Sequence, residues 1–237
     1  TGVNLEAVKL LFTAQNSAYA AKAVEEEIVA TSAIESIDFD RSSVRSIMLG
    51  NAPKDNQENR IYGLKLGFEF ISDRHNHITE ENIHKLYMMA IGNFLEGDDR
   101  LRDGEFYRHD DVYVVGGDGV VHRGIGSGKL PGYMKQFVDF ANADDGINDL
   151  LKAAMLHFDI AYLHPYFDGN GRMARLLHMW FLIQKGYEST LFVPMSSYIE
   201  KSRGKYYDAY TLVENNARLA GVTDVTPFLI YFIKNVY

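Results

Sequence analysis

Cysteine is absent from all 237 residues, and proline occurs only five times. The missing cysteine excludes disulfide frameworks, thiolate catalysis and zinc ribbons. It also fits a reducing compartment, so we expect a cytoplasmic protein. The few prolines leave no obvious linker between domains. A hydrophobic fraction of 46% is instead typical of a soluble chain that buries its own core.

Basic residues are outnumbered, with 24 Lys and Arg against 32 Asp and Glu and a net charge of −8. No basic stripe is present, so we expect no nucleic-acid partner. The most apolar stretch, residues 179–183, is far too short to span a bilayer, and we expect no membrane partner. The acidic cluster at residues 25–27 is typical of a solvated helix face.

Apolar residues recur at three- and four-residue spacing along most of the chain, which predicts a mostly α-helical fold. The expected helices cover residues 5–33, 78–95, 130–143, 147–163, 173–185, 204–219 and 227–236. Thr79 is a start signal for the second helix, and Gly186 is an end signal for the fifth. β-Branched and aromatic residues on both sides of the Gly-Gly-Asp-Gly run at 116–119 predict one β-hairpin.

Residues 164–175, His-Pro-Tyr-Phe-Asp-Gly-Asn-Gly-Arg-Met-Ala-Arg, form the most informative segment and lie between two predicted helices. Gly169 and Gly171 let the backbone turn tightly and approach a ligand closely. The free N–H groups at the start of the following helix then make a natural anion site.

Reactive side chains surround that predicted anion site. His164 is a candidate base, Asp168 a candidate ligand for a hard cation, and Asn170 supplies an amide. Arg172 and Arg175 are three residues apart on a helix, so both guanidinium groups can face one polyphosphate. These residue types together indicate phosphate ester chemistry with a divalent metal.

The same segment resembles the signature of the Fic family, His-x-Phe-x-Asp/Glu-Gly-Asn-Gly-Arg-x-x-Arg. Every fixed position matches except Tyr166, which stands where the family has Phe. The resemblance extends from about Thr31 to the C-terminus. It implies a Fic-like helical bundle with a central helix–loop–helix active-site motif and one β-hairpin flap. It also implies an N-terminal helical region, 1–75, and a Fic catalytic core, 76–237.

The Fic resemblance implies a protein adenylyltransferase, which moves AMP from ATP onto a Tyr, Ser or Thr hydroxyl of a target protein (AMPylation), with Mg²⁺. His164 would be the base, Asn170 and Arg172 would stabilise the transferring phosphate, and Asp168 would hold the metal. The residues that would bind ATP are Phe167, Asp168, Gly169, Asn170, Gly171, Arg172, Arg175, Val114, Val115, Tyr206 and Tyr207.

The resemblance also implies partners. The target protein would dock on the hairpin near residues 112–121 through main-chain hydrogen bonds. Tyr206 and Tyr207 would stack on the adenine, although either is equally suited to be a core aromatic of its helix. The sequence leaves the oligomeric state open, with a homodimer as one option.

Residues 30–37 resemble the inhibitory helix of the family, placed here near residues 25–37. Thr31 and Glu35 match, whereas Ser36 replaces the family's Gly or Asn. The implied role of Glu35 is to compete for Arg175 and hold the enzyme in check. An alternative needs no regulation, because Ser32-x-x-Glu35 also reads as a capping box.

Other functions for the same residues stay open at this point. The site could remove AMP from a modified protein, or it could take another nucleotide donor. A nucleotide-binding interaction module without turnover is a third reading, although a site without turnover would not need the base His164.

Overall fold

The computed structural model describes residues 16–116 and 119–237, and it leaves out the side chains of residues 16–18 and 114–122. None of the helices in this described part is long and apolar enough to cross a bilayer. The α-helices are α2 (Asn16–Ile34), α3 (Arg41–Met48), α4 (Asn56–Ser72), α5 (Glu80–Ala90), α6 (Leu130–Asn142), α7 (Asp149–Leu163), α8 (Asn170–Gln184), α9 (Met195–Lys201), α10 (Arg203–Ala220) and α11 (Thr226–Asn235). Short 3₁₀ turns are η1 (Gly92–Phe94), η2 (Gly97–Asp99), η3 (Ser127–Lys129) and η4 (Glu188–Phe192).

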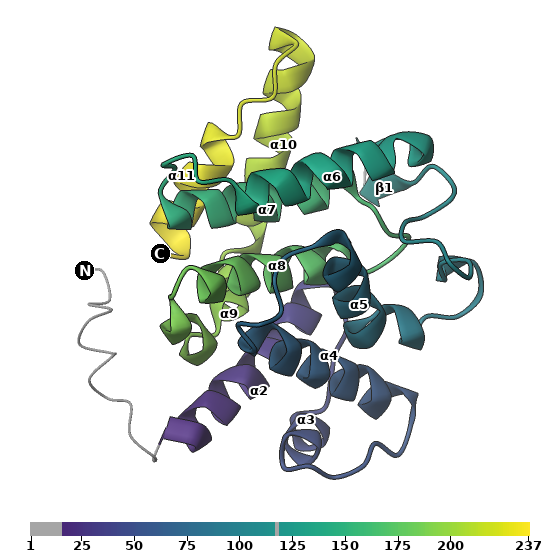
Figure 1. The fold of residues 1–237 in the computed structure, drawn as a ribbon, viewed down its shortest axis with the longest axis vertical. Helices are drawn as coiled ribbons and strands as arrows, with labels where there is room; N and C mark the ends of the chain where they lie inside the picture. Colours follow the sequence, from purple (N-terminus) through teal and green to yellow (C-terminus); the bar gives the residue numbers. More distant parts are fainter. Residues whose placement is uncertain (1–15, 117–118) are drawn as a thin grey trace.

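Helix α8 lies in the middle of a mostly helical fold, with α7 on one side and α4 and α2 on the other (Figure 1). It is buried almost all round, and Trp180 near its end is fully buried. The Trp180 indole N–H donates to the Asn76 carbonyl at 2.9 Å, which satisfies its polar atom. A helix without an exposed face needs partners on every side. The other elements therefore position the start of α8 firmly.

Helix α4 was not predicted from the sequence, because it is buried on more than one side and lacks a single apolar stripe. Two of its glycines allow close packing. A Cβ on Gly63 would lie 2.1 Å from the Phe94 ring, and one on Gly67 would lie 3.0 Å from Ala90 Cβ. These contacts fix α5 and η1 against α4.

The seven predicted helices are present with shifted ends, and residues 5–15 of the first of them lie outside the described residues. The Thr79 start signal is confirmed, since its hydroxyl accepts from the Asn82 N–H at 3.2 Å. α5 ends at Ala90 because Ile91 leaves helical geometry. α8 begins at Asn170, three residues earlier than expected, and Gly186 follows its end with a φ of 93°. α3 and α9 were not predicted, since each is short.

The two strands are β1 (Tyr113–Gly116) and β2 (Gly119–Arg123), which pair antiparallel. Tyr113 pairs with Arg123, and the register is irregular between Val114 and Val115. In the view of Figure 1, β1 lies just below the end of α6. Residues 117–118 of the predicted turn lie outside the described residues.

Two buried histidines, His157 on α7 and His178 on α8, predict a pH-dependent stability. Burial lowers the pKa of His157 well below its ordinary value and that of His178 to about 3. The folded protein keeps both rings neutral, whereas the unfolded chain binds protons below about pH 6.5. The stability is therefore fully present above that pH. It falls as the pH drops toward 3, by about 1.4 kcal/mol per pH unit for each histidine.

Urea unfolding at several pH values between about 4.5 and about 7.5 measures this slope. Replacing His178 with Gln should make the slope shallower, because one titrating site is lost. His75→Gln is the matched control, since the His75 side chain is 97% exposed. An unchanged slope in His178→Gln would contradict the contribution of His178 to the pH dependence of stability.

Candidate active site

His164 is the residue that ends α7, in a left-handed backbone conformation with φ 52° and ψ 59°. Its ring Nδ1 lies 3.2 Å from the Ala161 carbonyl oxygen. A carbonyl only accepts hydrogen bonds, so the proton of the neutral ring sits on Nδ1 and the lone pair on Nε2. The imidazole is thereby set as a base with its reactive nitrogen defined.

The loop after His164 is closed by Asn170. Its side-chain oxygen accepts from the Tyr166 N–H at 3.0 Å, and its side-chain nitrogen donates to the Tyr166 carbonyl at 2.9 Å. The Tyr166 ring is fully buried and stacks on Tyr87 with centroids 3.6 Å apart. Tyr166 therefore packs as the expected anchor. In the described part of the chain its hydroxyl has no hydrogen-bond partner.

Asp168 and Gly169 form the tip of the loop. Gly169 has a φ of 86°, and a Cβ there would lie 2.7 Å from Ile91, so glycine is required. One Asp168 oxygen accepts from the Gly169 N–H at 2.6 Å, and the other pairs with Arg172 at 2.8 Å. The Asp168 side chain is 49% exposed and can reach a ligand.

The first turn of α8 already holds an anion, the carboxylate of Glu35. A Cβ on Gly171 would lie 2.3 Å from Glu35 Oε1, so the carboxylate touches the helix where N–H groups point outward. Glu35 Oε1 also accepts from Arg175 Nη2 at 2.6 Å. Arg175 is 1% exposed and donates further to the Thr31 hydroxyl and carbonyl.

Each of the two arginines of α8 has one buried N–H donor that makes no hydrogen bond in the described structure. Arg172 Nε and Arg175 Nη1 have no hydrogen-bond partner among the described residues. A buried donor left unpaired costs about 1–3 kcal/mol. An anionic ligand with several oxygens would satisfy both donors, so this arrangement is suited to a polyphosphate.

The segment carrying Glu35 is the C-terminal end of α2. The Ile37 N–H donates to the Ser32 carbonyl at 2.9 Å, and the Ser36 N–H donates to the Ala33 carbonyl at 3.0 Å. This pair of bonds is a Schellman motif with Ser36 at its left-handed position, φ 59°. The capping-box interpretation of Ser32 is wrong, since Ser32 lies inside the last turn of α2.

Ser36 variants should therefore change stability in a predictable order. A β-branched residue is strongly disfavoured at positive φ, so Ser36→Val should lower the unfolding free energy by about 1–2 kcal/mol. Ser36→Asn should be tolerated, because Asn enters this region readily. Urea midpoints measure both, and equal stability of the two variants would contradict the strained turn.

The acidic cluster at residues 25–27 is not a solvated face, and that expectation was wrong. Glu27 is buried where α2 packs against α9, and the buried Glu25 pairs with Arg45 of α3 at 3.5 Å. Glu27 accepts from the Ser196 N–H at 2.8 Å and from its hydroxyl, while burial raises the pKa of Glu27. Glu27, Thr31 and Glu35 follow at four-residue intervals. That spacing was the signal that they share one helix face.

The predicted adenine contacts are separated by the fold. Tyr206 is 3% exposed, and its hydroxyl lies 2.8 Å from His157 Nε2, so it belongs to the core. Tyr207 is 43% exposed, with its ring edge-on to Tyr206. Phe167 packs edge-on against the His109 ring. The side chains of Val114 and Val115 lie outside the described part of the structure.

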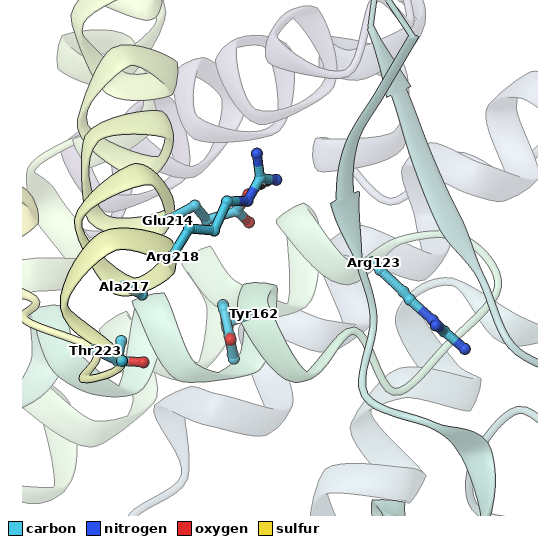
Figure 2. Close-up of a pocket in the computed structure, with 7 residues that line it drawn as sticks. Arg123, Tyr162, Glu214, Ala217, Arg218 and Thr223 are labelled. Atoms are coloured by element: carbon cyan, nitrogen blue, oxygen red, sulfur yellow. Dashed lines mark ion pairs between the residues drawn. The ribbon is translucent and has the colours of Figure 1, made fainter.

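A cavity of about 390 Å³ is lined by residues from β2, α7 and α10 and from the segment after α10. Figure 2 shows it between the hairpin and α10, with Tyr162 of α7 below. Glu214 and Arg218 reach into it from α10 and pair with each other at 3.6 Å. Tyr162 precedes His164 by two residues, so the cavity adjoins the end of α7.

Metal ligands are sparse in the described residues, where no group of three His, Cys, Asp or Glu side chains lies together. A metal at this site would have to be held by one carboxylate and by oxygens from a ligand. Mg²⁺ is commonly bound in that way, with phosphates and waters completing the shell. The exposed Asp168 fits that requirement.

The loop, its base and the arginines of α8 lie inside the segment 77–182, which matches the Fic/DOC family. Residues 77–182 are a Fic domain. The curated relatives include proteins named protein adenylyltransferase Fic from Drosophila willistoni and Culex quinquefasciatus. They are 29% identical over 194 and 195 residues, which is 80% of this chain. The chain spans about a third of their length, 34%.

Solved structures share the architecture around this Fic domain. A Fic family protein from Desulfovibrio desulfuricans matches with a TM-score of 0.75 at 18% identity, covering 95% of this chain and 65% of the other. A Fic domain containing signaling protein from Bacteroides thetaiotaomicron matches with a TM-score of 0.69 at 23% identity, covering 93% and 85%. At these identities the likeness concerns the fold. It covers the helices outside residues 77–182 as well.

Proposed function

We propose that this protein transfers AMP from ATP to a hydroxyl group of a target protein. The observation that carries the proposal is the pair of donors on Arg172 and Arg175 that have no partner in the described structure, both buried beside the first turn of α8. They form an anion site next to a base whose tautomer is fixed. The names of the curated relatives supply the nucleotide, because they are adenylyltransferases.

In the proposed reaction His164 Nε2 accepts the proton of the target hydroxyl, whose oxygen attacks the α-phosphorus of ATP. The bond between the α-phosphorus and the bridging oxygen breaks, and pyrophosphate leaves. The N–H groups at the start of α8 and the Arg172 guanidinium stabilise the charge that develops on the phosphate oxygens. Asn170 acts through the loop, because both ends of its amide are bonded to Tyr166.

Asp168 is the residue that would hold Mg²⁺ in this proposal. The ion would neutralise phosphate charge when bound. Asp168 would first have to release Arg172, with which it pairs at 2.8 Å. That release would free a second Arg172 nitrogen for the nucleotide.

The target protein would bind beside the hairpin at residues 112–121, where an extended segment can pair with a strand edge. The polar cavity between the hairpin and α10 offers room for side chains of such a segment. Tyr207, exposed beside Tyr206, is the better placed of the two tyrosines to contact adenine. Residues 1–75 would carry the regulatory segment, and residues 76–237 the catalytic core.

Glu35 is proposed to restrain the reaction. Its carboxylate lies at the first turn of α8 and pairs with Arg175, so it takes the place of a phosphate group. A nucleotide that bound beside it would meet like charge and one arginine already engaged. The α-phosphate would then not align with the incoming hydroxyl.

Transfer of the α-phosphate is the decisive test. When this protein is incubated with a cell lysate, a target protein should acquire label from ATP labelled at the α-phosphate. It should acquire none from ATP labelled at the γ-phosphate. Label from the γ-phosphate alone would replace the proposal with phosphorylation. Label from neither, in wild type and in Glu35→Gly, would overturn it.

Removal of AMP is a second candidate, favoured by the Glu35 carboxylate lying next to the phosphate site. A carboxylate there can orient a water molecule for attack on a protein-bound AMP. Loss of AMP from a premodified target, abolished by Glu35→Gly, would support this direction.

A further inference from the structure

Arg108 is a buried charge outside the predicted phosphate site. It precedes β1 in the chain, and its side chain is almost completely buried. The guanidinium donates to three backbone carbonyls: Nε to His164 at 2.7 Å, Nη1 to Asp110 at 2.6 Å, and Nη2 to Ile125. The planar fork of an arginine carries five N–H donors in a fixed geometry, which suits it to reach three acceptors from one side chain.

The three acceptors connect the hairpin to the base. Asp110 lies just before β1, and Ile125 lies just after β2. His164 ends α7 in a left-handed conformation. Main-chain bonds reinforce the connection on both sides of His164, since the Arg108 N–H donates to Pro165 at 2.9 Å and the Ile125 N–H to Leu163 at 3.3 Å.

Gly124 completes this connection. A Cβ at Gly124 would lie 2.7 Å from Arg108 Nη2 and 3.2 Å from His164 Cβ. The hairpin stem therefore lies directly on the base residue, and the space for any other side chain is taken. Movement of the stem would be passed to His164 through these contacts.

An arginine is a costly way to fill an interior volume, because its charge loses hydration and an apolar side chain would not. The charge is bonded to carbonyl oxygens, and Asp111 is the nearby carboxylate that favours it. Packing alone does not explain why an arginine occupies this buried position. The need to fix the direction of three carbonyl groups explains it.

We propose that Arg108 is a positioning residue that holds the His164 backbone to the chain segments before β1 and after β2. The hairpin and the base then form one rigid unit, so that a target docked on the hairpin arrives in a fixed relation to His164 Nε2. This inference rests on the proposed function for its consequence in catalysis. The effect of Arg108 on the position of His164 can be tested in protein that transfers no AMP.

The first test reads the His164 ring by NMR with isotope-labelled histidine, in wild type, Arg108→Lys, Arg108→Met and the control Arg74→Met. Arg74 is an exposed arginine paired with Glu188. The His164 signal, assigned by its loss in His164→Ala, should show the Nδ1–H tautomer in wild type and in Arg74→Met. In Arg108→Met and Arg108→Lys it should shift to a mixture of tautomers, while the buried His157 and His178 signals stay unchanged.

An unchanged His164 signal in both Arg108 variants would overturn the proposal. If Arg108→Met fails to fold, loss of the His157 and His178 signals would show it. In that case Arg108→Lys decides, because lysine keeps the charge and the aliphatic part of the side chain. The NMR result stands even if no nucleotide is ever transferred.

The second test measures transfer in a Glu35→Gly background. Arg108→Lys should lower kcat about tenfold or more, since a small misplacement of a reacting group is costly, and KM for ATP should stay within about twofold. Unchanged kcat would overturn the catalytic part of the proposal. Absence of transfer in Glu35→Gly itself would be a failure of the proposed function instead.

Discussion

Replacing Glu35 with Gly is expected to raise transfer of label from α-labelled ATP by about ten- to a hundredfold. The Glu35 carboxylate pairs with Arg175 at 2.6 Å and touches the first turn of α8. Removing it frees both for the nucleotide. Pairs of fully buried charges resist disruption by about 3–5 kcal/mol. The Glu35 side chain is 28% exposed, so solvent screening reduces the effect to the range given.

Two further variants sharpen the Glu35 test. Glu35→Gln keeps the shape and loses the charge, so its rate should lie between wild type and Glu35→Gly. Glu26→Gln is the matched control on the same helix, because Glu26 pairs with Arg41 at 2.7 Å near the surface. Its transfer rate should equal that of wild type. Equal label in wild type and Glu35→Gly, with a verified target present, would contradict restraint by Glu35.

Replacing His164 with Ala in the Glu35→Gly background is expected to lower kcat by about 10²–10⁴-fold, the usual contribution of a general base. ATP should bind with nearly unchanged affinity, because the phosphate site is built from α8 and its two arginines. Label transfer and ATP binding measured side by side separate the two effects. His75→Ala, at an exposed site, is the control.

An equal loss of ATP binding and transfer would point to a binding role for His164 and against a base. Retained transfer in His164→Ala would remove it from the reaction altogether. The tautomer set by Ala161 favours the base, since it leaves Nε2 as the acceptor.

Much of the site could be predicted because it is local. Residues 164–175 follow one another through the end of α7, a tight loop and the start of α8, so chain spacing alone brings a base, a carboxylate and two arginines together. The family resemblance located Glu35 as the competitor for Arg175. Neither periodicity nor composition could have paired these residues, which are 140 positions apart.

Other features depended on packing that the sequence does not reveal. The burial of Glu25 and Glu27 follows from the contacts of α2 with α3 and α9. Helix α4 was not predicted, because its glycines and its apolar residues on several faces leave no three- and four-residue apolar periodicity in the sequence. The Arg108 contacts join residues that are up to 57 positions apart, since 165 − 108 = 57.

The sequence by itself determined the helical class, the segment that carries the chemistry and the residue types available there, because these follow from spacing along a single stretch of chain. Apart from the Glu35–Arg175 pair, which the family resemblance implied, the tertiary structure decided which charges meet. It placed the Glu35 carboxylate at the start of α8, sent Arg172 and Arg175 to different partners, and bound Arg108 to His164. Burial sets these pairings, because a charge removed from water must take whatever partner the packed helices bring to it.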